Sequence, residues 1–286
     1  MTRNTGPTRA VRPNGPPPRS PAAPIGVFDS GIGGLTVVRE LMRQLPHESI
    51  IYFGDTARVP YGPKSPDTVR RYSHEISAFL LAEGVKAIVV ACNTATAHAL
   101  PALGDELPVP VIGVAEPGAQ AAVASSSSGR IGVIGTTGTV KSGAYDRAIH
   151  AIAPHALVTS RPCPLFVPLV EEGWLDTEPT RLIAREYLAP LHDAGVDAVV
   201  LGCTHYPLLK PVIGEVLGAG VRLVDPAEQT AAETKRVLDA RELRAPSTRG
   251  RATYRFIASD APEQFLRLGQ RFLGAAIERV DTLTLG

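Results

Sequence analysis

Two stretches of the sequence are near copies of each other, and each ends in or just past a cysteine. GVKAIVVACNT occupies residues 84–94 and GVDAVVLGCTH occupies residues 195–205. In both, Gly-Val opens a short apolar run of strand character, and the cysteine follows eight residues after the glycine. This repeat predicts two equivalent units, each with one thiol at the end of a strand.

The repeat extends beyond the cysteines. PIGVFDSG at 24–31 matches RIGVIGTTG at 130–138 in its Ile-Gly-Val opening, and each segment precedes its cysteine by a similar distance. After each cysteine, a further apolar run ends in an acid-proline pair, at 116–117 and 225–226. Three correspondences in the same order predict two α/β halves related by a pseudo-twofold axis. If the halves face each other, the two thiols meet across one cleft.

Short β-branched runs alternate with helical patterns from residue 25 to about 240, which is typical of βαβ units and parallel sheets. Pro66 and Pro207 each stand where a first helical turn would begin. A last strand at 254–259 and a helix at 260–274 are expected to close the fold. The other predicted strands lie at 25–29, 49–53, 86–91, 110–114, 130–135, 156–160, 197–202 and 221–224.

Composition places the chain among soluble globular proteins, with 44% apolar and 20% charged residues. No stretch approaches the roughly 20 apolar residues that span a bilayer, and no secretory signal is readable. Three cysteines favour free thiols in a reducing cytoplasm over a disulfide framework.

The charge is unevenly distributed. The chain carries a net charge of +1, and residues 1–24 hold four arginines and no acid, which leaves −3 for the remainder. A mildly acidic body argues against nucleic-acid binding, which requires a basic face. The tail also holds seven prolines, so we expect it to be disordered and dispensable for catalysis. Docking of a partner on the tail is the alternative.

The two repeated cysteines, Cys92 and Cys203, are the first candidates for chemistry. A cysteine at a strand end is often only a small buried hydrophobe. Here Asn93-Thr94 and Thr204-His205 follow the two sulfurs, and such residues cap helices. A helix N-terminus would lower the thiol pKa and make thiolate available near neutral pH. No CxxC or HxxxH spacing supports a metal site.

Two further segments contain candidate residues. FDSGIGGL at 28–35 ends a strand in Asp29 and Ser30 and predicts a flexible turn whose N–H groups can bind a carboxylate. GDTARVPYG at 54–62 supplies Asp55, Tyr61 and Gly62, either as a binding loop or as a surface turn.

His205 can hydrogen-bond the neighbouring sulfur of Cys203. Adjacent carboxylates such as Glu171 and Glu172 are predicted to be a surface pair. Cys163 has no partner in the repeat and is predicted to be structural.

At these motifs the chain resembles the glutamate racemases, cofactor-independent enzymes that interconvert L- and D-glutamate for peptidoglycan synthesis. The resemblance covers nearly everything from residue 25 to 286, and its motifs occur in the family's order and spacing. They are FDSGIGGL, YFGDTARVPYG, ACNTATA, GTTGTVKSGAY, CPLFVPLVEEG and GCTHYPLL.

The resemblance implies that Cys92 and Cys203 are the catalytic acid/base pair, with Asp29, Glu171 and His205 assisting proton transfer. It also implies a glutamate site with no metal or other cofactor. The residues that would line it are Asp29, Ser30, Tyr61, Gly62, Asn93, Thr94, Thr204 and His205.

By the same resemblance the chain crosses between two domains twice. We expect a first α/β domain at 25–115 plus 231–286 and a second at 116–230, with the active site in the cleft between them. Cys203 would take the proton from L-glutamate and Cys92 the proton from D-glutamate. A hinge would close the cleft and exclude water.

The resemblance also implies a cytoplasmic enzyme, without membrane association, that forms a homodimer. One alternative is a related racemase that acts on aspartate or a hydantoin. Another is an additional regulatory role, because some glutamate racemases are reported to inhibit DNA gyrase. A pyridoxal-phosphate racemase is disfavoured, since none of the five lysines stands in a motif that marks a Schiff base.

Overall fold

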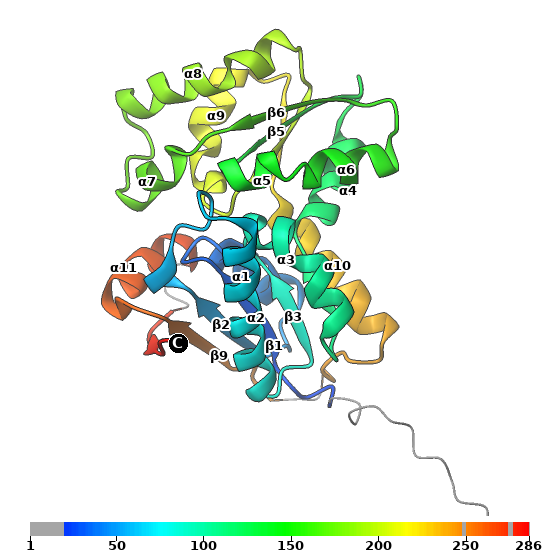
Figure 1. Ribbon diagram of the computed structural model, residues 1–286, viewed down its shortest axis with the longest axis vertical. Coiled ribbons are helices and arrows are strands. Elements are labelled where there is room, and N and C mark those ends of the chain that lie inside the picture. Colours follow the sequence, from blue (N-terminus) through cyan, green and yellow to red (C-terminus); the bar gives the residue numbers. More distant parts are fainter. Residues whose placement is uncertain (1–19, 248–249, 274–276, 286) are drawn as a thin grey trace, which may run out of the picture.

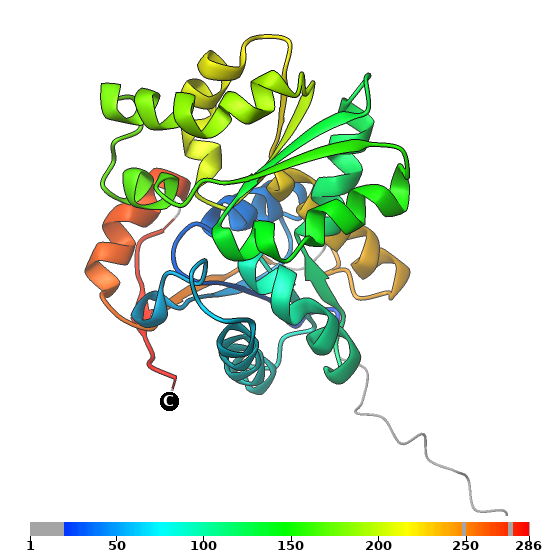
Figure 2. The ribbon, with the colours of Figure 1, turned by 45° about the horizontal axis from the view of Figure 1, so that its top comes forward.

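The computed structural model describes residues 20–247, 250–273 and 277–285. Most of the predicted tail at 1–24 therefore lies outside the described residues. The fold consists of two lobes, each a parallel sheet covered by helices, with one lobe above the other in Figure 1 and Figure 2.

The first lobe is built on a six-stranded sheet with the order β10-β9-β2-β1-β3-β4, in which every neighbouring pair is parallel. The strands are β1 (Ile25–Asp29), β2 (Ile50–Gly54), β3 (Ala87–Val90), β4 (Val111–Gly113), β9 (Tyr254–Ala258) and β10 (Asp281–Thr282). Its helices are α1 (Leu35–Gln44), η1 (Thr56–Arg58), α2 (Pro66–Ala82), α3 (Asn93–Glu106), α10 (Pro226–Ala240) and α11 (Pro262–Leu273).

The second lobe is built on a four-stranded parallel sheet with the order β6-β5-β7-β8. The strands are β5 (Arg130–Gly135), β6 (Leu157–Pro162), β7 (Ala198–Gly202) and β8 (Arg222–Val224). The helices are α4 (Ala115–Ser125), α5 (Thr137–Lys141), α6 (Ala144–Ile152), α7 (Phe166–Glu171), α8 (Glu178–Asp193), η2 (Tyr206–Leu209) and α9 (Lys210–Leu217).

The two lobes share one strand order, which confirms the two similar parallel-sheet units predicted from the repeat. The order β2-β1-β3-β4 in the first lobe corresponds to β6-β5-β7-β8 in the second. β1, β3 and β7 are buried along their whole length, because helices cover both faces of a parallel sheet. The glycines that open the repeat, Gly84 and Gly195, have φ of 80° and 63°. Both end a helix in the left-handed conformation that glycine adopts without strain.

Most predicted elements agree with the structure to within two residues. Pro207 is an exception, because it lies in the short 3₁₀ helix η2 and the α-helix begins only at Lys210. The two-residue strand β10 was not predicted, since two residues leave no periodic pattern to read.

Two helices join the lobes. α4 begins at Ala115 and packs against α6, whereas α10 packs against both α1 and α4. The predicted crossing near residue 115 thus falls at the start of α4, and the one near 230 falls inside α10. The division of the chain at these two points stays a prediction.

Candidate functional site

Both repeated cysteines line one small cavity at the junction of the lobes. The cavity has a volume of about 30 Å³ and is formed by the carboxyl ends of strands from both sheets. It brings together seven of the eight residues predicted to line the site: Ser30, Tyr61, Gly62, Asn93, Thr94, Thr204 and His205. Val59, Pro60, Thr136 and Val167 complete the wall.

Cys92 caps the first turn of α3. Its sulfur accepts a hydrogen bond from the Ala95 N–H at 3.4 Å, and the residue is 5% exposed. Burial raises the pKa of this thiol to about 12, and the nearby Asp29 carboxylate adds to the rise, against hydrogen bonds from Ala95 and Ser30. The predicted lowering of the thiol pKa by the helix N-terminus is therefore wrong for Cys92, because desolvation of the thiolate outweighs one N–H contact.

Cys203 has a different partner. It directly follows β7, and its sulfur lies 3.9 Å from His205 Nδ1. On the other side of the imidazole, Nε2 lies 3.1 Å from Glu171 Oε1. Burial lowers the pKa of His205, but the contacts with Cys203 and Glu171 outweigh burial and raise that pKa to about 10. An imidazolium at His205 places a positive charge beside the Cys203 sulfur.

These surroundings make the two thiols unequal. Cys92 is held as a neutral thiol by burial and by the charge of Asp29, whereas Cys203 faces a cation. The cavity is therefore lined by two thiols with different electrostatic surroundings. A proton exchange between two faces of a substrate requires two such groups.

Asp29 lies beneath the cavity and does not line it. The side chain is fully buried and accepts a hydrogen bond from the Gly31 N–H at 3.1 Å, and the Thr204 hydroxyl lies 3.5 Å from its Oδ1. Burial raises the pKa of Asp29, while the positive charge of His205 opposes the rise. Asp29 thus acts electrostatically on the Cys92 thiol and on His205.

The glycines of the DSGIGGL turn permit this close approach. A Cβ on Gly33 would lie 2.3 Å from Thr204 Oγ1, and one on Gly34 would lie 2.6 Å from the Asp29 Cβ. Gly33 thus lets the turn pack directly against the second lobe, whereas Gly34 lets it pack tightly within the first.

Tyr61 reaches the cavity from the loop after η1. Its hydroxyl donates to Asp55, whose carboxylate also binds the Arg58 guanidinium and the Ser259 hydroxyl. Asp55 is fully buried and does not line the cavity. Asp55 therefore supports the Tyr61–Gly62 segment by hydrogen bonding.

Hydrogen bonds across the junction fix Asn93 and Thr94. The Tyr145 hydroxyl, on α6 of the second lobe, donates to Asn93 Oδ1 at 2.6 Å. The Thr94 hydroxyl lies 2.9 Å from that of Thr136 and 3.3 Å from that of Thr139. Sequence reasoning did not single out these three second-lobe residues, although they all stand in the GTTGTVKSGAY segment that pairs with the DSG turn in the repeat.

Of the remaining residues considered in the sequence, Glu171 lies at the junction of the lobes, and Glu172 and Cys163 lie elsewhere. Glu171 ends α7 and is partly exposed, and its Oε1 lies 3.1 Å from His205 Nε2, whereas Glu172 is exposed and makes no such contact among the described residues. Cys163 is fully buried in the hydrophobic core, and its thiol donates to the Arg161 carbonyl at 3.6 Å.

The described residues contain no group of three or more His, Cys, Asp or Glu side chains that could hold a metal ion. Within the same part of the chain, every helix is too short or too polar to cross a membrane.

The fold and the paired thiols define the class of protein. Residues 25–234 match the Asp/Glu/Hydantoin racemase family, and the chain belongs to that family. It is an amino-acid racemase.

Within the family the chain is most similar to glutamate racemases. That of Geobacter metallireducens is 56% identical over 261 residues, which cover 91% of this chain and 96% of the relative. The crystal structure of glutamate racemase isoform RacE1 from Bacillus anthracis, 42% identical, superposes with a TM-score of 0.88 over 92% of this chain and 98% of that one. The Francisella tularensis enzyme, solved in complex with D-glutamate, is 40% identical and gives 0.86 over 93% and 98%.

Proposed function

We propose that this racemase interconverts L- and D-glutamate by a two-base transfer of the Cα proton between Cys203 and Cys92. The observation that carries the proposal is the presence of both thiols in one cavity, with a histidine beside only one of them. The similarity to glutamate racemases over more than nine tenths of the chain supports glutamate as the substrate.

In the direction from L to D, the Cys203 thiolate removes the Cα proton and becomes a thiol. The Cys92 thiol gives its proton to the opposite face of the same carbon and becomes a thiolate. The two sulfurs have then exchanged protonation states, so the enzyme is ready for D-glutamate. It returns to its first state by the reverse reaction or by proton exchange with water.

The carbanion formed between the two transfers needs stabilisation by preorganised donors. Because the Tyr145 hydroxyl donates to Asn93 Oδ1, the Asn93 amide group is left to donate to the substrate α-carboxylate. The hydroxyls of Ser30, Thr94 and Thr204 are further donors in the cavity wall.

Glutamate requires the cavity to enlarge. A volume of about 30 Å³ has room for only a few water molecules, so we infer that the lobes separate before the amino acid enters and close again around it. Closure then excludes water and strengthens every hydrogen bond in the site.

Incubation of the purified protein with L-glutamate, L-aspartate and a hydantoin, followed by chiral chromatography, tests the substrate. We expect the D-enantiomer to accumulate from L-glutamate alone. Racemisation of aspartate or a hydantoin with glutamate unchanged would assign the same two-thiol mechanism to a different substrate and contradict the proposal.

The cellular role follows from the activity. We propose that the enzyme supplies D-glutamate for peptidoglycan in the cytoplasm, in keeping with its three free cysteines. We expect the protein to form a homodimer. Its molar mass in solution, measured by light scattering after size-exclusion chromatography, tests this. As a second, independent proposal, the protein inhibits DNA gyrase through a contact made by residues 1–24. Unchanged gyrase inhibition after deletion of these residues would show that the tail does not make this contact.

A further inference from the structure

A second and larger cavity lies next to the cavity of the two thiols. It has a volume of about 470 Å³ and is lined from the first lobe by the segment after Tyr61, by α2 and by α3, and from the second lobe by α5. Gly62 lines both cavities. The full lining of the larger one is Gly62, Pro63, Lys64, Pro66, Arg70, Ala97, His98, Thr137, Gly138, Lys141 and Ser142.

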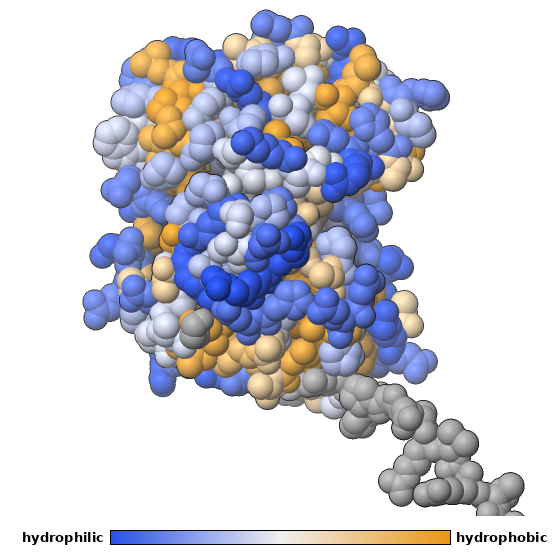
Figure 3. Space-filling model, in the orientation of Figure 1, coloured by the Kyte–Doolittle hydropathy of each residue, from blue (hydrophilic) through white to orange (hydrophobic). Residues whose placement is uncertain are grey.

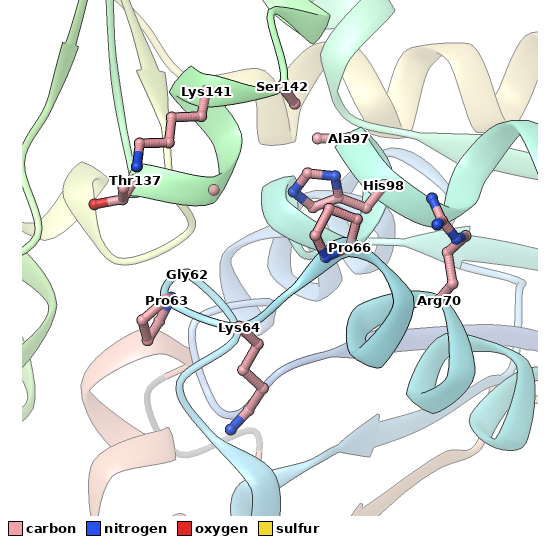
Figure 4. A pocket seen from close by; sticks show the side chains of 11 residues that line it. Gly62, Pro63, Lys64, Pro66, Arg70, Ala97, His98, Thr137, Lys141 and Ser142 are labelled. Atoms are coloured by element: carbon pink, nitrogen blue, oxygen red, sulfur yellow. The ribbon is translucent and has the colours of Figure 1, made fainter.

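The lining of this cavity is basic. It includes Lys64, Arg70 and Lys141 and no carboxylate. Arg70 pairs with Asp67, whereas no ion pair within the described residues engages Lys64 or Lys141. In Figure 4 these two lysines extend on either side of the Gly62–Pro63 segment, one from each lobe. Figure 3 shows hydrophilic residues gathered over α2 on this face.

The barrier between the two cavities consists of contacts between the lobes. The Gly138 N–H donates to the Gly62 carbonyl at 2.9 Å, and beside it the Thr94 hydroxyl meets that of Thr136 at 2.9 Å. A Cβ on Gly62 would come within 2.8 Å of the Thr136 Cβ. Separation of the lobes would break these contacts and join the two cavities into one passage.

We infer that the larger cavity is the entry vestibule for the dicarboxylate substrate, and that Lys64 and Lys141 attract it electrostatically. This inference rests on the proposed function. Residues 25–286, the two lysines included, carry a formal net charge of −3, so a basic lining at the entrance favours the approach of an anion. Cations within about 10 Å of its path attract it at moderate salt. Because the two ammonium groups are separate and flexible, they are better suited to attract a passing anion than to hold it in one position.

The test compares two double variants that each remove one cation per lobe. The first is Lys64→Gln with Lys141→Gln. The control is Lys235→Gln on α10 with Arg222→Gln on β8, both exposed and outside the two cavities. Steady-state racemisation of L- and D-glutamate is measured from low to high sodium chloride, and thermal melting verifies that each variant folds.

We expect the vestibule variant to lose about three- to tenfold in kcat/KM at low salt with kcat unchanged, and to lose most of the salt dependence shown by the wild type. The control is expected to match the wild type. A kcat/KM equal to that of the control, or a loss confined to kcat, would overturn the inference while leaving the proposed function intact. Activation of the wild type by inorganic phosphate beyond chloride of equal ionic strength would make the cavity a regulatory anion site and also overturn it.

Discussion

At the scale of single residues, the two thiols differ because of what surrounds them. Cys92 is kept protonated by burial and by Asp29, and Cys203 is paired with His205. The repeat in the sequence predicted the two cysteines, since both stand at equivalent strand ends. It did not predict the elevated pKa of Cys92, because desolvation depends on the packing of both lobes around the sulfur and leaves no mark on the local sequence.

The substitution His205→Asn tests the role of the imidazole. Removal of the cation that stabilises the Cys203 thiolate is expected to lower kcat/KM by about 100-fold. The loss must be equal for L- and D-glutamate, because the two enantiomers have the same free energy. Polarimetry from each enantiomer measures both values. Activity within a factor of two of the wild type would remove His205 from the mechanism.

The same histidine contributes to stability in a pH-dependent way. Its pKa in the folded protein, about 10, lies above the ordinary value of 6.5. The stabilisation is therefore complete below pH 6.5 and is lost as the pH rises toward 10. We expect the wild type to have a higher free energy of unfolding than His205→Asn. This difference should be largest at pH 6 and smaller at pH 10. Urea titrations at the two pH values measure it, and a constant difference would contradict the assigned charge.

At the scale of elements, the turn between β1 and α1 is tightly packed at Gly34, within the first lobe. A methyl group on Gly34 would lie 2.6 Å from the Asp29 Cβ and 2.8 Å from the Tyr52 hydroxyl. Gly34→Ala is therefore expected to destabilise the protein by about 1–3 kcal/mol and to reduce activity strongly. The control is Gly104→Ala in α3, where a Cβ has no neighbour within 4 Å.

Gly104→Ala is expected to stabilise the protein by up to about 1 kcal/mol, because alanine favours a helix over glycine. Urea unfolding of both variants gives the two free energies. Equal effects of the two substitutions would mean that the turn is not tightly packed.

Strands and helices were largely predictable because apolar runs and proline positions mark them locally. Pro66 opens α2 as expected, with Ser65 as its N-cap. The contacts between lobes were not predictable in the same way. Tyr145 and Asn93 are 52 residues apart in the chain, and only the folded arrangement of the two sheets shows that they meet.

At the scale of the whole molecule, contacts between the lobes complete the site. The Tyr145–Asn93 hydrogen bond joins the lobes and holds the oxygen of an amide that lines the cavity. Tyr145→Phe removes this one hydroxyl and leaves the ring in place. We expect kcat/KM to fall by about 10-fold, with a loss of stability of about 1 kcal/mol.

Comparison with a second variant separates orientation of the amide from simple stability. Tyr206→Phe removes a buried hydroxyl that donates to the Cys163 carbonyl at 2.7 Å within the second lobe. It is expected to cost similar stability with a much smaller change in kcat/KM. Equal kinetic losses in the two variants would show that Tyr145 acts only through stability.

The central claim is that each thiol serves one face of the substrate, and wash-in of deuterium at Cα tests it most directly. Cys92→Ser and Cys203→Ser are each incubated in D₂O with pure L- or D-glutamate, and exchange is followed by proton NMR. Cys92→Ser is predicted to exchange L-glutamate faster than D-glutamate, and Cys203→Ser the reverse, with little racemisation in either. Equal exchange of both enantiomers by both variants would contradict the assignment.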